Sequence, residues 1–294
     1  MRHHPLHFML YCAQMFNANY HSHSKYCHHA SGELTEYAEE AVKAGLKEIG
    51  ISDHIPLSKK AKEVLAPYIR HSGSLSLRMD FVDLPSYLSD IASVKSAFKN
   101  QLNVLAGFES EYNEFDADYY RLMREKVDYL NLGIHYVYND GILYDFMDNR
   151  VHEDGGIRRI EKKDVMVYAE NCIAALDSKL FSQMVHPDVF MRCIRAEDFD
   201  SRMEECSRAI IESAVKNEVC LEINTSDIFR SSAGFCRLRY PAENFWKIVS
   251  GYKNARVLIG TDAHEPKRIA DFQMEYVSDF MERFKLKVEP AMKI

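Results

Sequence analysis

The sequence has no apolar run long enough to cross a bilayer. Its first apolar stretch, 6–13, is interrupted by His7 and is too short to resemble the apolar region of a signal peptide. We therefore interpret residues 1–16 as a leader or an approach to the first strand. No low-complexity segment or Pro/Gly/Ser-rich linker follows, so we expect residues 17–294 to form a single domain, with no membrane partner.

The sequence also lacks cysteines at the spacings typical of disulfide or zinc sites, and it lacks an excess of positive charge. The seven cysteines show neither a disulfide framework nor a zinc knuckle, which favours a reducing cytoplasm. The 37 basic and 44 acidic residues give a net charge of −7, so the overall charge does not attract long nucleic acid. An anionic substrate would have to be captured locally, by metal ions or a few arginines.

Short β-rich runs alternate with amphipathic, helix-period runs along the chain of 294 residues. The expected strands are 17–23, 48–54, 102–109, 127–137, 181–186, 219–225 and 256–261. The expected helices are 34–42, 84–98, 119–126, 164–176, 203–215, 243–252 and 267–284. This alternation predicts a parallel sheet covered by helices.

Seven β/α repeats over this length suit a closed barrel better than an open sheet, although a doubly wound sheet remains the alternative. No Gly-x-Gly-x-x-Gly or Walker motif follows any strand, so the sequence does not indicate a nucleotide-cradling loop. Two longer connections, 55–83 and 138–163, are candidates for loops that face a substrate.

Histidines and carboxylates recur where the expected strands end. The first strand ends in His21-Ser22-His23, and because side chains alternate along a strand, these imidazoles point the same way and can share an ion. His29 follows past a turn and can fold back to the same place. The other strand ends carry Asp53-His54, Glu109, His135, His186, and Asp262-Ala263-His264.

The carboxyl ends of barrel strands form one rim, where such folds build their active sites. Imidazole together with carboxylate is the ligand set that Zn²⁺, Fe²⁺ and Mn²⁺ prefer. A single His-x-His pair is more often a solvated or capping pair than a metal site. Because the signal recurs at separate strand ends, the joint pattern predicts a metal centre.

These motifs, in this order, resemble the polymerase-and-histidinol-phosphatase (PHP) family of phosphoesterases over nearly the whole chain. The resemblance is greatest to the histidinol-phosphatase branch, through the turn Ser24-Lys25-Tyr26-Cys27-His28-His29, the strand end 107–112 and the segment 221–226. It implies a single-domain α/β fold, a distorted (β/α)7 TIM-like barrel that holds three divalent metal ions, which the ligand set leaves open as Zn²⁺, Fe²⁺ or Mn²⁺.

The resemblance also implies which residue holds which ion. The first would be bound by His21, His23, Glu109 and Asp262. The second would be bound by the bridging Glu109 with His135 and His186, and the third by His29, His54 and His264. Two positions depart from the family: Asn19 stands where an aspartate is usual, and His28 replaces a residue that is often proline.

The remaining candidates concern the substrate. Arg230, after the sixth strand, resembles the family's arginine in that loop and could bind phosphate in bidentate fashion, while Arg158 and Arg159 are further candidates; each could instead be a solvated surface charge. Asp53 could orient a ligating histidine or donate a proton. Glu222 and Asn224 share a strand face and could orient ligands or contact the substrate amine, although their position favours a buried hydrogen-bonding network.

The implied function is a phosphomonoesterase of histidine biosynthesis, which releases histidinol and phosphate from histidinol phosphate by means of a hydroxide that bridges two metal ions. A PHP-type phosphodiesterase or nucleotide hydrolase would use the same metals on another small phosphorylated substrate. The third hypothesis is a metal-binding module without catalytic activity.

Overall fold

Seven short strands form the centre of the molecule. The computed structural model describes residues 16–68, 83–147, 157–158 and 160–294. The strands are β1 (Ala18–Asn19), β2 (Glu48–Ile51), β3 (Asn103–Ser110), β4 (Tyr129–Leu132), β8 (Gln183–Met184), β9 (Cys220–Asn224) and β10 (Val257–Gly260). They pair in the order β1-β2-β3-β4-β8-β9-β10, and every pair is parallel.

The sheet curves until its two edges nearly meet. Ser22 and Ala263 form a parallel bridge across the gap, and the His23 amide donates to the Ala263 carbonyl at 2.8 Å. The expected barrel of seven parallel strands is thus confirmed, and the open doubly wound alternative is wrong. The closure also places the segments that follow β1 and β10 side by side.

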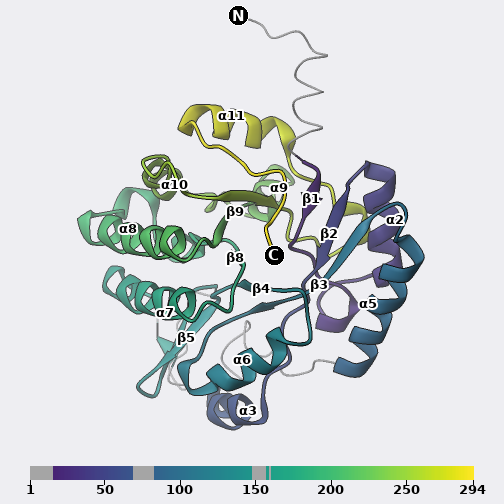
Figure 1. Ribbon diagram of the computed structural model, residues 1–294. Helices are drawn as coiled ribbons and strands as arrows, with labels where there is room; N and C mark the ends of the chain where they lie inside the picture. The colour runs from purple at the N-terminus through teal and green to yellow at the C-terminus, as the bar shows by residue number, and fades with distance from the viewer. Residues whose placement is uncertain (1–15, 69–82, 148–156, 159) are drawn as a thin grey trace, which may run out of the picture.

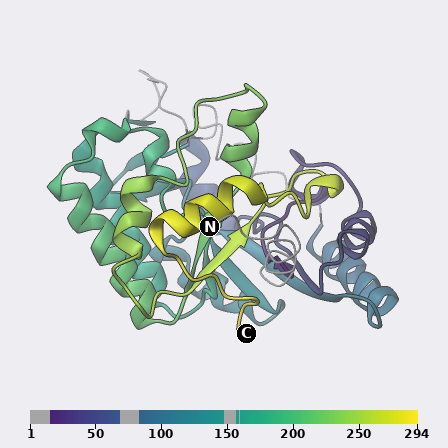
Figure 2. The ribbon, with the colours of Figure 1, turned by 90° about the horizontal axis from the view of Figure 1, so that it is seen from above.

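Helices surround this ring of strands (Figure 1). They are α2 (Leu34–Ala44), α3 (Lys59–Leu65), α5 (Leu84–Phe98), α6 (Ala117–Arg124), α7 (Val165–Asp177), α8 (Ser201–Lys216), α9 (Ser226–Ser232), α10 (Glu243–Val249) and α11 (Met274–Phe284). The turned view shows α11, in yellow, lying across the outside of the strands (Figure 2). In the described residues no helix is long and apolar enough to cross a membrane.

Helix α2 illustrates how the sequence places a helix on the sheet. Its apolar positions Leu34, Tyr37 and Ala41 recur at helical spacing and are all buried. At its start, the Glu33 and Glu36 side chains form a reciprocal capping box that satisfies two backbone amides. The polar face is left to solvent, so one side of the helix packs on the barrel.

The fourth expected strand, 127–137, is wrong in its extent. The structure ends β4 at Leu132 and starts a separate strand, β5 (Tyr136–Asn139), which forms a small sheet with β6 (Ile142–Asp145) and β7 (Ile157–Arg158). At Gly133, between the two strands, an added Cβ would lie 2.1 Å from Glu109 Oε1. The chain therefore passes close to that carboxylate as it leaves β4, and it bends at His135 before β5 begins.

The two long connections contain more secondary structure than the sequence indicated. Helix α3 lies within 55–83, and β6 and β7 lie within 138–163. Residues 69–82 and 148–156 of these connections are outside the described residues, as is most of the expected leader. Of residues 1–16 only Phe16 is described, and its ring packs against Phe272 with centroids 5.1 Å apart.

Candidate metal centre

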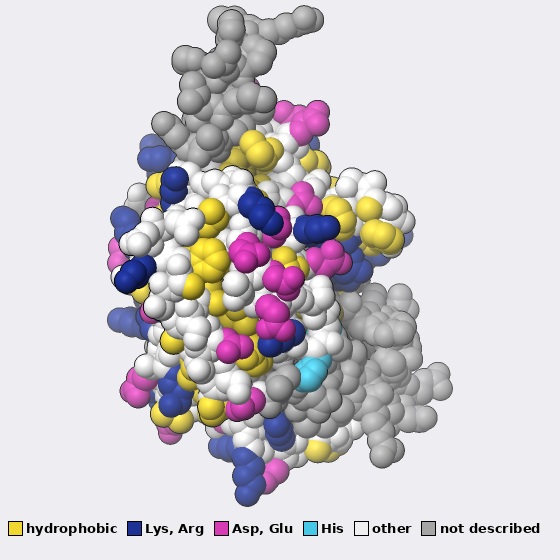
Figure 3. Space-filling view, turned by 90° about the vertical axis from the view of Figure 1, so that its right-hand side faces the viewer, with side chains coloured by type: hydrophobic (Ala, Val, Ile, Leu, Met, Phe, Trp, Pro, Cys, Tyr) yellow, Lys and Arg dark blue, Asp and Glu magenta, His cyan; other side chains and the backbone are white. Residues whose placement is uncertain are grey.

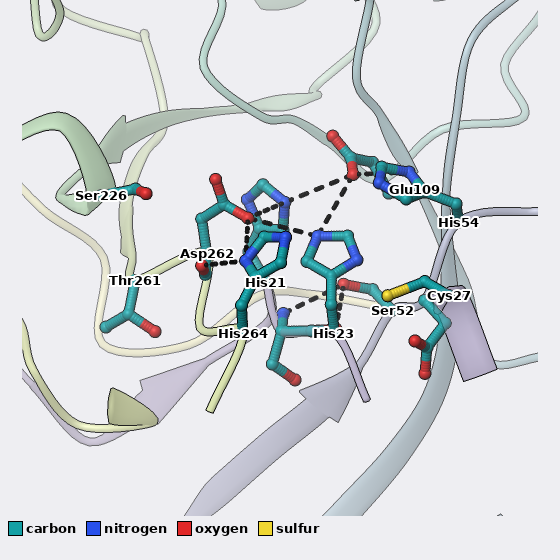
Figure 4. Close-up of polar contacts among 12 residues, drawn as sticks. His21, His23, Cys27, Ser52, His54, Glu109, Ser226, Thr261, Asp262 and His264 are labelled. Carbon is teal, nitrogen blue, oxygen red and sulfur yellow. Dashed lines mark hydrogen bonds and ion pairs between the residues drawn. The ribbon is translucent and has the colours of Figure 1, made fainter. Parts of the chain in front are cut away.

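The candidate ligands come from separate elements and converge at the carboxyl-terminal rim of the barrel. Figure 4 labels His21, His23, His54, Glu109, Asp262 and His264 among them. They lie two to four residues after the ends of β1, β2, β4, β8 and β10, and Glu109 is the next-to-last residue of β3. His29 arrives from the turn after the short helix η1 (Lys25–Cys27). The structure thus brings together all nine: His21, His23, His29, His54, Glu109, His135, His186, Asp262 and His264.

Glu109 lies at the centre of the cluster and is 1% exposed. Its Oε1 is 2.9 Å from His186 Nε2 and 3.4 Å from His135 Nε2. Its Oε2 faces the other way, 3.3 Å from His23 Nε2 and 3.6 Å from His21 Nε2. A carboxylate whose two oxygens face separate groups of imidazoles is suited to bridging two cations.

Asp262 completes the group on the Oε2 side. Its Oδ1 lies 3.4 Å from His21 Nε2 and 3.2 Å from His23 Nε2. Asp262 is 15% exposed and His264 is 32% exposed, whereas His21 and Glu109 are almost fully buried. The cluster therefore opens to solvent on the side of Asp262 and His264, and a substrate can approach there.

Three imidazoles surround the outer part of the cluster. The ring of His29 lies 5.1 Å from that of His54 and 4.8 Å from that of His264, measured between centroids. His29 Nδ1 faces the Cys27 carbonyl, and His264 Nδ1 faces the Asp262 carbonyl, each at 2.8 Å. Protons on these Nδ1 atoms leave the Nε2 lone pairs available to a cation.

Two buried imidazole nitrogens without hydrogen-bond partners indicate that the cluster fits bound cations. His21 Nε2 and His23 Nε2 are buried and make no hydrogen bond within the described structure. Buried polar atoms without partners are costly, and a cation held between them and the carboxylates would remove that cost. Within the described residues, tight donor groups include His21-His23-Asp262, His21-Glu109-His186 and His23-His54-Glu109.

Burial and the close packing of imidazoles and carboxylates shift the pKa values within the cluster. Burial alone would lower the pKa of His21, but Glu222, Asp262 and Glu109 raise it to about 10. Burial opposes ionisation of Glu109, yet His135, His54 and His21 hold its pKa well below the usual value. Burial and the neighbouring His23 lower the pKa of His264 to about 3. The carboxylates are therefore ionised and suited to cations.

A second set of side chains holds the ligands in place. The Glu222 carboxylate accepts from His21 Nδ1 at 2.8 Å and from the His186 amide at 2.9 Å. Glu111 Oε1 lies 2.9 Å from His135 Nδ1. Glu111, the first residue after β3, was missed by the sequence reasoning, although its spacing of two residues from Glu109 was a usable signal.

Asp53 lies behind His23 and is fully buried. Its oxygens accept from the amide and from the hydroxyl of Ser24, each at 2.7 Å, and burial raises its pKa. His23, Cys27 and Asp53 form a further tight donor group. Asp53 therefore fastens the turn that leads to His29.

The structure shows the surroundings of Asn19 and His28, the two residues that depart from the family pattern. Asn19 is buried, donates to Thr261 Oγ1 at 2.6 Å and accepts from the His21 amide at 3.1 Å, so it ties β1 to the end of β10. His28 is exposed and has a left-handed backbone (φ 60°), whereas His29 lies against the other imidazoles. The geometry thus favours His29 over His28.

The candidate arginines have different positions. Arg230 is exposed in the last turn of α9. Arg158 lies in β7, and Arg159 lies outside the described residues. The sequence reasoning missed Arg192, six residues after His186, whose Nη1 is 3.6 Å from Asp227 Oδ1 and 3.5 Å from the Tyr240 hydroxyl.

Tyr240 connects Arg192 to the cluster. Its ring centroid lies 6.3 Å from that of His186, and the Arg192 guanidinium lies 5.9 Å from the Tyr240 ring centroid. The Arg192 side chain is 21% exposed, so part of it faces solvent. A planar, partly exposed guanidinium beside a cation cluster is suited to phosphate.

Comparison with known proteins gives a family match and several relatives. A model of the PHP domain matches residues 19–226. A histidinol-phosphatase from Bacillus subtilis is 23% identical over 260 residues, which cover 83% of this chain and 92% of that protein. A probable histidinol-phosphatase from Schizosaccharomyces pombe is 23% identical over 264 residues, which cover 85% of this chain and 81% of that protein.

Two solved structures share the fold. A putative histidinol phosphatase from Listeria monocytogenes superposes with a TM-score of 0.70 at 19% identity, covering 88% of this chain and 99% of the other. A histidinol phosphate phosphatase from Lactococcus lactis, crystallised with zinc, L-histidinol and phosphate, gives a TM-score of 0.65 at 15% identity, covering 95% of this chain and all of the other, 100%.

Proposed function

This chain belongs to the PHP domain family, and from that premise we propose that it is a metal-dependent phosphomonoesterase that converts histidinol phosphate to histidinol and phosphate. The observation that carries the proposal is the position of Glu109, whose two oxygens face separate groups of imidazoles in a buried cluster. The histidinol-phosphatase relatives, and the Lactococcus structure with histidinol and phosphate, support the choice of substrate.

We assign three divalent ions to the cluster as the family resemblance implies. The first group is His21, His23, Glu109 and Asp262; the second is Glu109, His135 and His186; the third is His29, His54 and His264. Zinc in the Lactococcus structure supports Zn²⁺, while the ligand types also accept Fe²⁺ and Mn²⁺.

Phosphomonoester hydrolysis needs more than proton transfer. Enzymes accelerate it by up to about 10²¹-fold, whereas general acid–base catalysis supplies only about 10²–10⁴-fold. Divalent ions, when bound, lower the pKa of a coordinated water and neutralise phosphoryl charge. The protein's own contribution is to hold Glu109 between the imidazole groups and to orient His21 and His135 through Glu222 and Glu111.

Arginines would complete the phosphate site. We propose that Arg230 and Arg192 bind phosphoryl oxygens, because both are near the carboxyl rim and present planar donors. Arg158 and Arg159 stay candidates from the adjoining connection. We assign Asp53 a positioning role, because its oxygens already accept from Ser24 and it is fully buried.

One feature of the surface bears on the alternative substrates. On the described part of the face seen in Figure 3, basic and acidic side chains are interspersed without a continuous basic stripe. Together with the net charge of −7, this favours a small substrate over long nucleic acid. The proposal places the reaction in the cytoplasm and in histidine biosynthesis.

The test begins with protein purified without chelator. Elemental analysis measures bound metal, and phosphate release is then compared for histidinol phosphate, mononucleotides and a chromogenic diester. We expect bound divalent metal and the highest kcat/KM for histidinol phosphate. Faster turnover of the diester would identify a phosphodiesterase, and full metal occupancy without turnover of any ester would identify a binding module.

A further inference from the structure

A second cavity, of about 430 Å³, lies beside the loops that support the metal centre. It is bounded by residues 191–196, which run on from the end of η5 (Val189–Arg192), by residues 237–244, and by Tyr276 of α11. No candidate metal ligand is among the described residues that line it. Its volume falls within the range of about 300–1,000 Å³ that small-molecule sites occupy.

The rim of this cavity is basic in a protein of net negative charge. Arg195, Arg237 and Arg239 all line it. Arg195 is paired with Asp198 at 2.8 Å, whereas exposed Arg237 forms no ion pair with any described residue. Glu243 is the one acidic residue among the described residues of the lining, and Arg283 neutralises it by donating to both of its oxygens at 2.5 and 2.7 Å.

The floor of the cavity is apolar. Met191, Ile194, Leu238, Pro241 and the Tyr276 ring contribute to its lining. An apolar floor with guanidinium groups at one edge is the arrangement that binds an amphipathic anion, because the ring or chain is desolvated while the head group meets planar donors.

The cavity wall is also bonded to residues beside the metal centre. The Ala242 amide donates to Asp188 Oδ2 at 2.5 Å, and Asp188 follows His186 by two positions. The Arg239 amide donates to Asp227 Oδ2 at 3.0 Å, and the Arg239 side chain donates to the Arg192 carbonyl. A ligand that orders residues 237–242 would therefore restrain Asp188 and Arg192.

We propose that this cavity binds a small organic anion with an apolar body, and that its occupancy is coupled to the metal centre through Asp188 and Arg192. The anionic head group lies at Arg237 and Arg239, and the apolar body lies on Ile194 and Leu238. The site is separate from the phosphate site and does not depend on which phosphoester the metal centre hydrolyses.

The binding test uses 1-anilinonaphthalene-8-sulfonate, a fluorescent aromatic sulfonate, with the full metal-loaded chain. We expect saturable fluorescence enhancement with one site per chain. Arg237→Glu should weaken the dye roughly tenfold or more, because a guanidinium that meets the sulfonate is replaced by a like charge. The matched control is Arg202→Glu, an exposed arginine on α8 outside the cavity, which should leave the affinity unchanged.

Two results would overturn the assignment of the site. If Arg237→Glu and the parent bind the dye with equal affinity, the dye does not bind in this cavity. If saturating inorganic phosphate displaces the dye, the dye binds at the metal centre instead. The coupling is measured as the dissociation constant of the bound divalent metal with and without dye. A change of at least threefold in this dissociation constant in the parent, absent in Arg237→Glu, supports the coupling. An unchanged dissociation constant in the parent contradicts the coupling.

Discussion

The Glu222 carboxylate accepts a hydrogen bond from His21 Nδ1 at 2.8 Å, and both side chains are completely buried. The contact orients the other ring nitrogen, Nε2, toward Glu109 and Asp262. Glu222 also accepts from Asn224 Nδ2 at 2.9 Å, so the carboxylate itself is held on β9. A residue far along the chain from His21 thus determines its ring orientation and tautomer.

Glu222→Gln should weaken the metal centre without unfolding the barrel. The amide keeps the shape but removes the charge that favours a proton on His21 Nδ1, and changes of this kind typically cost about 10–100-fold in metal affinity or activity. Metal affinity and phosphate release measure the effect. Glu218→Gln, an exposed glutamate just before β9, is the control and should match the parent. Unchanged metal affinity in Glu222→Gln would contradict the orienting role.

His29 and its neighbour His28 allow a matched comparison that tests the third group of ligands. His29→Ala should lower metal content and turnover, because the His29 ring lies against those of His54 and His264. His28→Ala should leave both unchanged, because His28 is exposed. Elemental analysis and phosphate release from the two variants check this. Equal losses in both variants would mean that the turn, rather than the ligand, was disturbed.

Metal removal should destabilise the fold. A ligand present at 100 times its dissociation constant stabilises the native state by about 2.7 kcal/mol, which corresponds to roughly 4 °C in Tm for a domain of this size. Thermal unfolding with and without chelator measures the shift, and added Zn²⁺ should restore the original Tm. A His21→Ala variant should show a smaller shift. No response to chelator in the parent would argue against ions bound at the cluster.

The sequence predicts the barrel well because its signals are local. Six of the seven barrel strands fall within an expected strand, and β3 ends one residue after its expected range, at Ser110. The histidines that follow the strands are visible as short motifs. Helix α5 (Leu84–Phe98) agrees with its expected bounds because its apolar positions recur at helical spacing. The PHP resemblance rests on the same motifs, and the family match confirms it.

The errors arise where tertiary contacts override local pattern. The apolar run 127–137 resembles one strand, but Gly133 packs against the Glu109 carboxylate after β4 has ended. The chain then bends at His135. Arg192 was missed because its relevance depends on Asp227 and Tyr240, which are distant in sequence. Helix α9 was missed because Ser226–Ser232 is short and polar. The metal-ligand and substrate assignments stay predictions.

The C-terminal segment offers a pH-dependent test away from the metal centre. Glu289 Oε2 lies 3.0 Å from Arg256 Nη2, and this hydrogen bond lowers the pKa of Glu289 below its usual value. A lowered pKa stabilises the fold above the usual glutamate pKa, and this stabilisation is lost as pH falls through the lowered value. Glu289→Gln should therefore lower Tm near neutral pH, and the difference from the parent should disappear once the pH is below the lowered pKa of Glu289.

The expected size of that effect is modest. Partly exposed ion pairs contribute about 0.2–1 kcal/mol, which corresponds to at most about 2 °C in Tm. Glu282→Gln, an exposed glutamate on α11, is the control and should show no pH-dependent difference from the parent. A Tm difference for Glu289→Gln that persists at low pH would mean that packing, rather than charge, is responsible.

Arg192 should act on the phosphate through its planar fork and through its place between Asp227 and Tyr240. Arg192→Lys keeps the charge but loses the bidentate geometry, so we expect kcat/KM for the phosphomonoester to fall by about 10–100-fold with metal content unchanged. Arg230→Lys should give a loss of the same kind if both arginines bind phosphate. Arg202→Lys, on an exposed face of α8, is the control. Steady-state kinetics with parallel metal analysis separate the roles: a loss of activity that follows loss of metal would assign Arg192 to the support of His186 instead.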